Sequence, residues 1–298
     1  SSFYNGFGNP DTQQFGSNLS AQYAPGNANG FPDKAETDGV IGKVTYSWKP
    51  SEDRMYYVTW SEGFRPGLLN RPVGRTSADG SYSVPPSVDS DEITNWEFGW
   101  KNVLRDGRLR FNGSIFRVDV SGLQSTIFDP SIVNLFFSDN AADAEIKGVE
   151  GDFIYYTDGG LILSGAFSML DTEITKSLIP TGDIVVGQEL AFAPGYQANI
   201  SGRKEWTMEG GNTGFWQLQF SMSDKSYSDI MQPNRAVQDS YNLTNLRAGI
   251  SSDDWTAEMY IDNVTDERAE ISNTFVFDRQ RVAVIRPMTV GLRYKLKF

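Results

Sequence analysis

Three arginines in one short stretch are the side chains of this sequence best suited to binding chemistry. They lie in GFRPGLLNRPVGR (63–75), where Arg65, Asn70, Arg71 and Arg75 accompany two prolines that restrict the backbone. The net charge of the chain is -12, so a local group of arginines could bind an anionic ligand such as a carboxylate or a ferric chelate. Arg65 could instead brace the loop by packing, and for Arg65 this interpretation is favoured.

A second set of candidate side chains is aromatic. Phe128, Phe136 and Phe137 lie among aspartates in the segment 122–144. Exposed rings on a loop could stack on sugars, aryl groups or an iron chelate, whereas buried rings would give the loop a small core of its own, and the second interpretation is favoured. The acidic residues of these segments lack the spacing of a calcium loop, so no metal site and no cofactor is predicted.

The absence of two residue types restricts the possible chemistry further. The sequence contains no histidine and no cysteine. This removes Cys-rich zinc sites, thiol nucleophiles and every Ser-His or Cys-His catalytic pair. Carboxylate pairs are common, but none has a context that marks it for acid-base catalysis. We therefore expect this protein not to be an enzyme.

The charge balance excludes another class of function. Lys and Arg number 26 against 38 Asp and Glu, and no basic cluster offsets the repulsion from phosphates, so no nucleic acid partner is expected.

No apolar run approaches the length of a membrane helix, and the first residues carry no signal-peptide pattern. The hydropathy test is blind to membrane strands, in which apolar and polar residues alternate.

Such alternation is the dominant pattern of the chain, and helical periodicity is nearly absent. Even positions from Met288 to Phe298 are apolar, for example, while the residues between them are polar or small. In the segment 108–121 the apolar set changes position between Phe111 and Phe116, so a bulge or a change of face is expected there. The pattern predicts strands near 38–49, 54–64, 91–103, 108–121, 145–157, 161–173, 190–206, 214–227, 240–251, 254–264 and 286–298.

The connections between these strands alternate in length. Short turns such as LRDG, TDGG and SSDD join one pair of strands, and a long connection joins the next. The long connections are 65–90, 122–144, 174–189, 228–239 and 265–285. Long strands in up-and-down order, with short turns at one end and long loops at the other, are typical of an outer-membrane barrel. The expected fold class is all-β, a transmembrane up-and-down antiparallel β-barrel, and the less favoured alternative is a large secreted β-sheet protein.

The alternation also assigns side chains to the two faces of such a barrel. Aromatic residues make up 13% of the chain, which suits the girdles at the two membrane interfaces. We expect lipid contact on one face and a solvated polar wall in the lumen. The expected lipid-facing side chains include Trp96, Trp100, Trp216 and Trp255, and the expected lumenal ones are Glu97, Lys101, Glu150 and Asp152.

Several stretches resemble the C-terminal half of TonB-dependent outer-membrane receptors. The resemblance runs from about residue 37 to the end and keeps its order. Each motif is weak alone, and their order makes the set specific. The stretches are YYVTWSEGFRPGLLN (56–70), DSDEITNWEFGWKNVLRDGRLRFNGSIFRVDVSGLQ (89–124), NAADAEIKGVEGDFIY (140–155), YIDNVTDERA (260–269) and RPMTVGLRYKLKF (286–298).

This resemblance implies a fold, a location and a set of partners. Members have a 22-stranded barrel with an N-terminal plug, and segment 37–298 would be its C-terminal part, about 11 strands; residues 1–36 read as an extracellular loop or partial strand. The implied function is TonB-dependent uptake of a scarce nutrient, such as a ferric siderophore or an oligosaccharide, in the bacterial outer membrane. The implied partners are outer-membrane lipid, the missing barrel half and plug, TonB through that missing part, the barrel-assembly machinery and a small-molecule ligand.

The C-terminal residue has a separate role under this resemblance. Phe298 would be the aromatic signal that the barrel-assembly machinery reads, although packing on lipid would also explain it. The alternative to a receptor segment is a stand-alone passive or secretory barrel channel of about 12 strands, the twelfth lying around 14–23. Strand parity disfavours that alternative, because single-chain bacterial barrels have even strand numbers and eleven strands are predicted.

Overall fold

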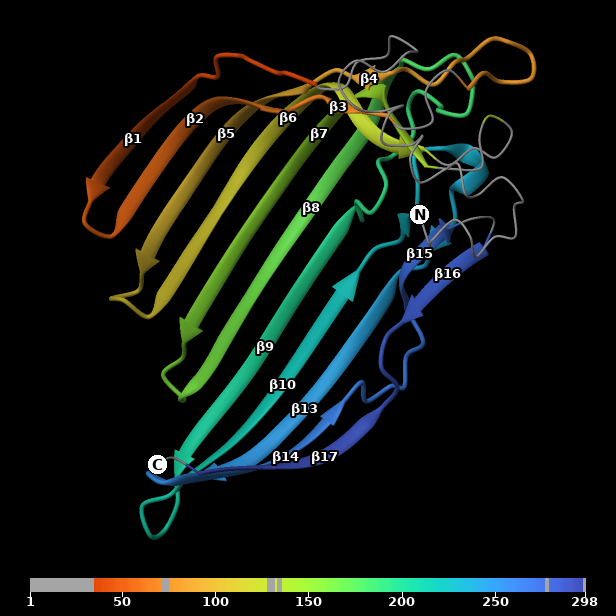
Figure 1. Cartoon of the computed structure of the whole chain (residues 1–298). Helices are drawn as coiled ribbons and strands as arrows, with labels where there is room; N and C mark the ends of the chain where they lie inside the picture. Colours follow the sequence, from red (N-terminus) through yellow and green to blue (C-terminus); the bar gives the residue numbers. More distant parts are fainter. Residues whose placement is uncertain (1–34, 71–74, 128–131, 133–135, 277–278, 297–298) are drawn as a thin grey trace.

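The computed structural model describes residues 35–70, 75–127, 132, 136–276 and 279–296. Its main element is an 11-stranded sheet in which strand order follows chain order. All neighbouring strands are antiparallel, and the sheet curves like a piece of a barrel wall (Figure 1). The strands are β1 (Lys43–Ser51), β2 (Arg54–Arg65), β5 (Asp91–Leu104), β6 (Leu109–Ile127), β7 (Phe137–Tyr156), β8 (Leu161–Ser177), β9 (Tyr196–Thr207), β10 (Thr213–Ser223), β13 (Tyr241–Ser251), β14 (Trp255–Asp262) and β17 (Thr289–Leu296).

Each predicted strand overlaps one strand of this sheet, so the expected up-and-down sheet is confirmed. Several boundaries differ: β9 begins at Tyr196 and not at 190, and β1 begins at Lys43 and not at 38. β6 and β7 continue past their predicted ends and pair as far as Ile127 and Phe137. Of the two alternatives between Phe111 and Phe116, the change of face is confirmed and the bulge is wrong, because the β5–β6 register is uninterrupted there. Phe111 and Phe116 simply face opposite sides of the sheet, and the irregularity lies at Val120–Leu123.

Smaller elements occupy the long connections. They are three two-stranded pairs, β3 (Leu68–Leu69) with β4 (Ser87–Val88), β11 (Ser226–Tyr227) with β12 (Val237–Gln238), and β15 (Glu270–Val276) with β16 (Arg279–Val284), and a short 3-10 helix, η1 (Gln232–Asn234). The segment 265–285, predicted as a long connection, contains the β15–β16 pair. Among the described residues, no helix is long and apolar enough to cross a membrane.

The two ends of the strands differ in construction, as predicted. Short turns join the strands at one end, and the long connections gather at the other (Figure 1). The β5–β6 turn shows how the sequence makes such a reversal: Arg105, Asp106 and Gly107 all have positive φ, of 55°, 56° and 85°. Asp and Gly tolerate this left-handed conformation better than other residues, so the LRDG stretch suits a tight hairpin.

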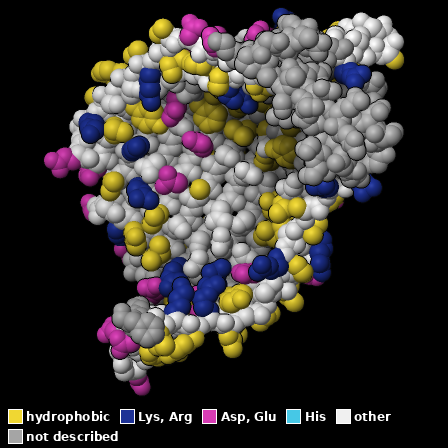
Figure 2. All heavy atoms as spheres, in the orientation of Figure 1, with side chains coloured by type: hydrophobic (Ala, Val, Ile, Leu, Met, Phe, Trp, Pro, Cys, Tyr) yellow, Lys and Arg dark blue, Asp and Glu magenta, His cyan; other side chains and the backbone are white. Residues whose placement is uncertain are grey.

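The two faces of the sheet also differ. Figure 2 looks into the hollow of the sheet, where charged side chains lie along the strands. Cross-strand register places Glu97, Ser114 and Glu150 on this lumenal face, and Phe98, Ile115 and Val149 on the opposite, outward face. The four tryptophans expected to contact lipid, Trp96, Trp100, Trp216 and Trp255, all lie on the outward face by the same register. The alternation therefore assigns the two faces as predicted.

The main cluster of buried hydrophobic side chains lies at the loop end, not within the sheet. We call this packed layer of long connections the cap. Because its core joins residues from four connections to the ends of β6, β7 and β8, the loops form one packed unit. The core consists of Tyr82, Val84, Ile127, Ile132, Phe137, Ala141, Ala142, Ile174, Ile179, Ile184, Ile230 and Met231.

Candidate ligand-binding surface

Arg65 is a brace at the base of the cap. Its Nε donates to Asp91 Oδ2 at 2.8 Å, and its guanidinium also donates to the carbonyl oxygen of Gln124 at 3.1 Å. Asp91 is fully buried and in turn accepts from the backbone N–H groups of Arg65 and Gln124. A buried carboxylate with these partners costs much to disturb, so Arg65 joins β2, β5 and β6 where the loops begin.

Asn70 makes a second structural connection. Its side-chain N–H group donates to the carbonyl oxygens of Ser138 at 2.7 Å and Pro85 at 3.0 Å. Its Oδ1 accepts from the Ser138 N–H at 2.8 Å, so one buried amide joins the connection 65–90 to the start of β7. The carboxamide is fully used by the backbone, which matches a role in loop packing.

Asn140 and Gln124 complete this set of loop contacts. Asn140 Oδ1 accepts from the Asp89 N–H at 2.8 Å, and its Nδ2 donates to the carbonyl oxygens of Asp89 and Gly122. Gln124 Nε2 donates to the carbonyl oxygens of Pro66 and Asp89. Sequence reasoning had placed Asn140 in a family-like motif without assigning it a role. The sequence feature that could have indicated this role is an Asn close to a predicted strand, because Asn side chains often form hydrogen bonds with the backbone of loops.

The predicted aromatic residues separate in the structure. Phe137 lies in the cap core, with its ring centroid 6.0 Å from that of Tyr82. The Tyr82 hydroxyl donates to Asp139 Oδ2 at 2.6 Å, and burial raises the pKa of this phenol. The adjacent Phe136 is 39% exposed. Phe137 therefore gives the loop a core of its own, whereas Phe136 lies at the surface.

The predicted ligand residues that the structure describes differ in their exposure. Asn70 and Phe137 lie inside the cap, and Arg75 is exposed, with its carbonyl oxygen accepting from the Val84 N–H at 2.8 Å. Arg71, Phe128 and Phe298 lie outside the described residues. Ligand contact by Arg65, Asn70, Arg71, Arg75, Phe128, Phe136 and Phe137 stays a prediction, as does the assembly role of Phe298.

A cationic and aromatic cluster in the connection 224–240 was missed by sequence reasoning. The guanidinium carbon of Arg235 lies 3.8 Å from the Tyr227 ring centroid, and Lys225 Nζ lies 5.6 Å from it. Arg235 also donates to the carbonyl oxygen of Asp229 at 2.7 Å, and burial lowers the pKa of Arg235. Two cations around one phenol can bind an anionic or aromatic group. The spacing of Lys225, Tyr227 and Arg235 follows no helix or strand period, so the sequence alone does not indicate that these three side chains lie together.

The lumenal wall below the cap is polar and internally paired. Tyr57 donates to Glu97 at 2.5 Å, and Ser114 donates to Glu150 at 3.3 Å. Farther along the sheet, guanidinium groups pair with carboxylates, as in Arg293 with Glu258 at 2.9 Å and Arg247 with Asp262 at 3.5 Å. In the part of the chain that the structure describes, no group of three or more acidic side chains could hold a metal ion.

An antiparallel meander with an apolar outward face, a polar hollow and a cap at one end defines the wall of an outer-membrane-type β-barrel. The family model for the TonB dependent receptor-like β-barrel matches residues 6–264. This chain belongs to that family.

Solved structures share the fold. The ferric yersiniabactin uptake receptor FyuA from Yersinia pestis aligns with a TM-score of 0.68 at 16% identity, over 87% of this chain and 37% of that one. The siderophore receptor PiuA from Acinetobacter baumannii gives 0.63 at 18%, over 85% and 35%. The ferric citrate transporter FecA gives 0.65 at 14%, over 87% and 38%. The chain thus spans less than two fifths of the length of each of these proteins.

Proposed function

We propose that this chain is part of the barrel of an energised outer-membrane receptor that imports a scarce nutrient, with an anionic ferric chelate as the favoured ligand class. Family membership supports the receptor assignment. The similar structures include a ferric yersiniabactin uptake receptor and a ferric citrate transporter, which supports the ligand class. An oligosaccharide is the second ligand class that the sequence leaves open. Neither class calls for catalysis by the chain.

The observation that supports the proposal is that some residues of the cap fix the loops to the sheet while other residues of the cap carry cationic side chains. Arg65 and Asn70 hold the connection 65–90 onto the sheet, while Arg75 on the same connection remains exposed. Lys225 and Arg235 supply further cationic groups from another connection. Loops fixed at their base can present such side chains to a ligand with little loss of conformational entropy on binding.

The edges of the sheet support the need for further barrel strands. In the described structure β1 pairs only with β2, and β17 only with β14. In hydrocarbon each unpaired N–H or C=O group costs several kcal/mol, so two open edges cannot lie in lipid. Both edges would pair with strands outside these 298 residues. A plug and a TonB-contacting segment, both implied by the family resemblance, would also lie outside them.

A transport assay on the full-length protein in intact cells tests the proposal. Ferric siderophores, oligosaccharides and aromatic compounds are supplied in parallel, with and without a proton uncoupler. Arg75→Ala should weaken uptake of an anionic ligand by about tenfold, because one charge-assisted hydrogen bond is worth about 1.5 kcal/mol or more. Arg108→Ala is the matched control, since Arg108 lies beside the β5–β6 turn at the opposite end of the sheet.

Two results would contradict the proposal. Uptake that continues with the uncoupler present would favour the passive channel. Equal uptake by the Arg75 and Arg108 variants, with surface expression confirmed for both, would remove Arg75 from the ligand site.

A further inference from the structure

The outward face of β2–β8 carries three adjacent rows of different chemistry. The first contains only apolar residues, the second joins two tryptophans to charged residues, and the third is polar and mainly acidic. Residues within each row are direct cross-strand partners. From the turn side to the loop side, the rows are Val58, Phe98, Ile115, Val149 and Met169; Trp60, Trp96, Arg117, Lys147 and Asp171; and Glu62, Thr94, Asp119, Glu145 and Glu173.

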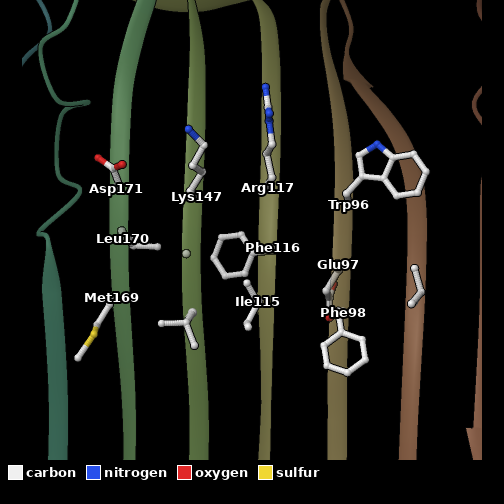
Figure 3. A pocket seen from close by; sticks show the side chains of 13 residues that line it. Trp96, Glu97, Phe98, Ile115, Phe116, Arg117, Lys147, Met169, Leu170 and Asp171 are labelled. Atoms are coloured by element: carbon white, nitrogen blue, oxygen red, sulfur yellow. The ribbon is translucent and has the colours of Figure 1, made fainter.

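A shallow groove follows the first row. Its volume is about 880 Å³, and its lining includes Phe98, Ile115 and Met169. These side chains are about half exposed, so the groove is an apolar surface open to its surroundings. Figure 3 shows Arg117, Lys147 and Asp171 side by side along its loop-side border, with Ile115 and Met169 below them. The groove therefore ends at a charged border.

A shared carboxylate fixes the two cations of this border. Arg117 Nη2 lies 2.6 Å from Glu145 Oε2, and Lys147 Nζ also pairs with Glu145. The Glu145 side chain is only 14% exposed, whereas those of Arg117 and Lys147 are 55% and 51% exposed. Both cations therefore keep N–H donors for a further anionic group. Asp119 also pairs with Arg117, at 3.0 Å, and competes with such a group.

The position of the two cations along their strands places them at a membrane boundary. Arg117 lies eight residues from the turn-side end of β6, and Lys147 lies nine residues from that of β7. With about 3.3 Å per residue and a strand tilt of about 40°, they lie roughly 20 to 23 Å from the turns. The apolar band of outer-membrane barrels is about 25 Å tall, so both cations lie near its loop-side border.

Other strands lack such cations at the same height. Nine residues from the turn-side ends of β9, β10 and β13, the outward positions are Ala198, Met222 and Asn242, which form one cross-strand row. None of the three is charged. The paired cations are thus a local feature of β6 and β7, not a general property of this border.

We propose that β5–β8 bind one phosphorylated lipid of the outer leaflet, with a phosphate at Arg117 and Lys147 and an acyl chain in the groove below. The free N–H donors of Arg117 and Lys147 select a phosphate, because both side chains are fixed at the groove border and half exposed, although Asp119, Glu145 and Asp171 lower the net charge there. The apolar row selects a chain attached to that phosphate. The outer-membrane location used here is that of the proposed function, but the site needs no transported ligand.

Native mass spectrometry of the full-length protein in detergent tests this site, with bis-phosphorylated lipid A and its dephosphorylated form as probes. Arg117→Gln with Lys147→Gln should weaken binding of the phosphorylated probe by about tenfold, as expected for the loss of charge-assisted bonds. Lys204→Gln is the matched control, because Lys204 faces outward near the turn end of β9. Asp171→Asn should strengthen binding, because it removes a carboxylate that repels the phosphate.

Each other outcome has a defined meaning. Equal binding of both probes would make the groove a surface for any acyl chain and overturn the phosphate site. Weaker binding of the phosphorylated probe by Asp171→Asn would contradict repulsion between Asp171 and the phosphate and overturn the placement of the phosphate at this border. A dimer abolished by the double variant would indicate a second copy of the chain on this face. Heat-modifiable migration in electrophoresis separately reports whether each variant is a folded barrel, so failure of the membrane assignment is distinguishable.

Discussion

The sheet and the cap bury their apolar side chains in opposite ways. In the sheet, Leu292 on β17 is 84% exposed on the outward face. In the cap, Ile174 and Phe137 are almost completely buried among side chains from several connections. Under the proposed function the sheet would have lipid as its apolar partner, whereas the cap has a core like that of a small water-soluble domain. Stability in the two regions therefore depends on different surroundings.

The largest effect expected from a substitution that tests this comparison is in the cap core. Phe137→Ala should destabilise the cap by about 3 to 5 kcal/mol, because it leaves a cavity among residues that cannot relax fully. Phe136→Ala changes the adjacent, exposed ring and is the matched control. Hydrogen exchange of the full-length protein in lipid should show faster exchange in the cap for Phe137→Ala only.

If the Phe137 and Phe136 variants exchange alike, the cap has no core of the kind described. If Phe137→Ala also speeds exchange in β9–β14, the cap and the sheet form one cooperative unit, and the comparison between them fails.

Introducing a charged side chain on the outward face of the sheet should have the next largest effect on the free energy of unfolding. Leu218 faces outward on β10, and Gln219 beside it faces the lumen. Leu218→Arg should cost about 2 to 4 kcal/mol if the side chain lies near the bilayer midplane, whereas Gln219→Arg should cost far less. Urea unfolding of the full-length protein from lipid vesicles measures both. Similar costs for the two variants would mean that the outward face does not contact lipid.

A smaller effect is expected from the buried amide that joins the connection 65–90 to β7. Asn70→Ala leaves the Ser138 N–H group and two carbonyl oxygens without their partner, at an expected cost of about 1 to 3 kcal/mol. Asn242→Ala on the exposed end of β13 is a matched control. Hydrogen exchange at Ser138 should increase in the first variant and not in the second. Unchanged exchange at Ser138 would contradict the loop-packing role of Asn70.

The sheet was predictable because its physical cause is local and periodic. Residues such as Trp216, Leu218 and Phe220 alternate with polar neighbours, and short turn sequences mark the reversals. The extra length of β6 and β7 was missed because Gly122 and Asp143 interrupt the alternation. In the structure the Gly122 N–H donates to Asp143 Oδ1, and this hydrogen bond accommodates the Val120–Leu123 irregularity.

The cap was not predictable in the same way. Ile179, Ile184 and Ile230 come from connections without periodicity, so nothing local shows that they share one core with Phe137. The sequence identified Arg65 and Asn70 as residues of interest, but their partners Asp91 and Ser138 are distant along the chain. Long-range hydrogen bonds of this kind become visible only in the folded structure.

The central claim is that the edges of this sheet pair with strands outside the 298 residues. Cysteine cross-linking in membranes tests it directly, because the sequence has no native cysteine. Pairs that combine Val44, Tyr46 or Trp48 of β1 with Val290, Leu292 or Tyr294 of β17 are compared with Leu218 and Leu246, which are cross-strand partners. The account predicts disulfide formation in the control pair and none between β1 and β17 of the full-length protein. Efficient cross-linking of β1 to β17 in a consistent register would show that the eleven strands close into their own barrel, and would contradict the account.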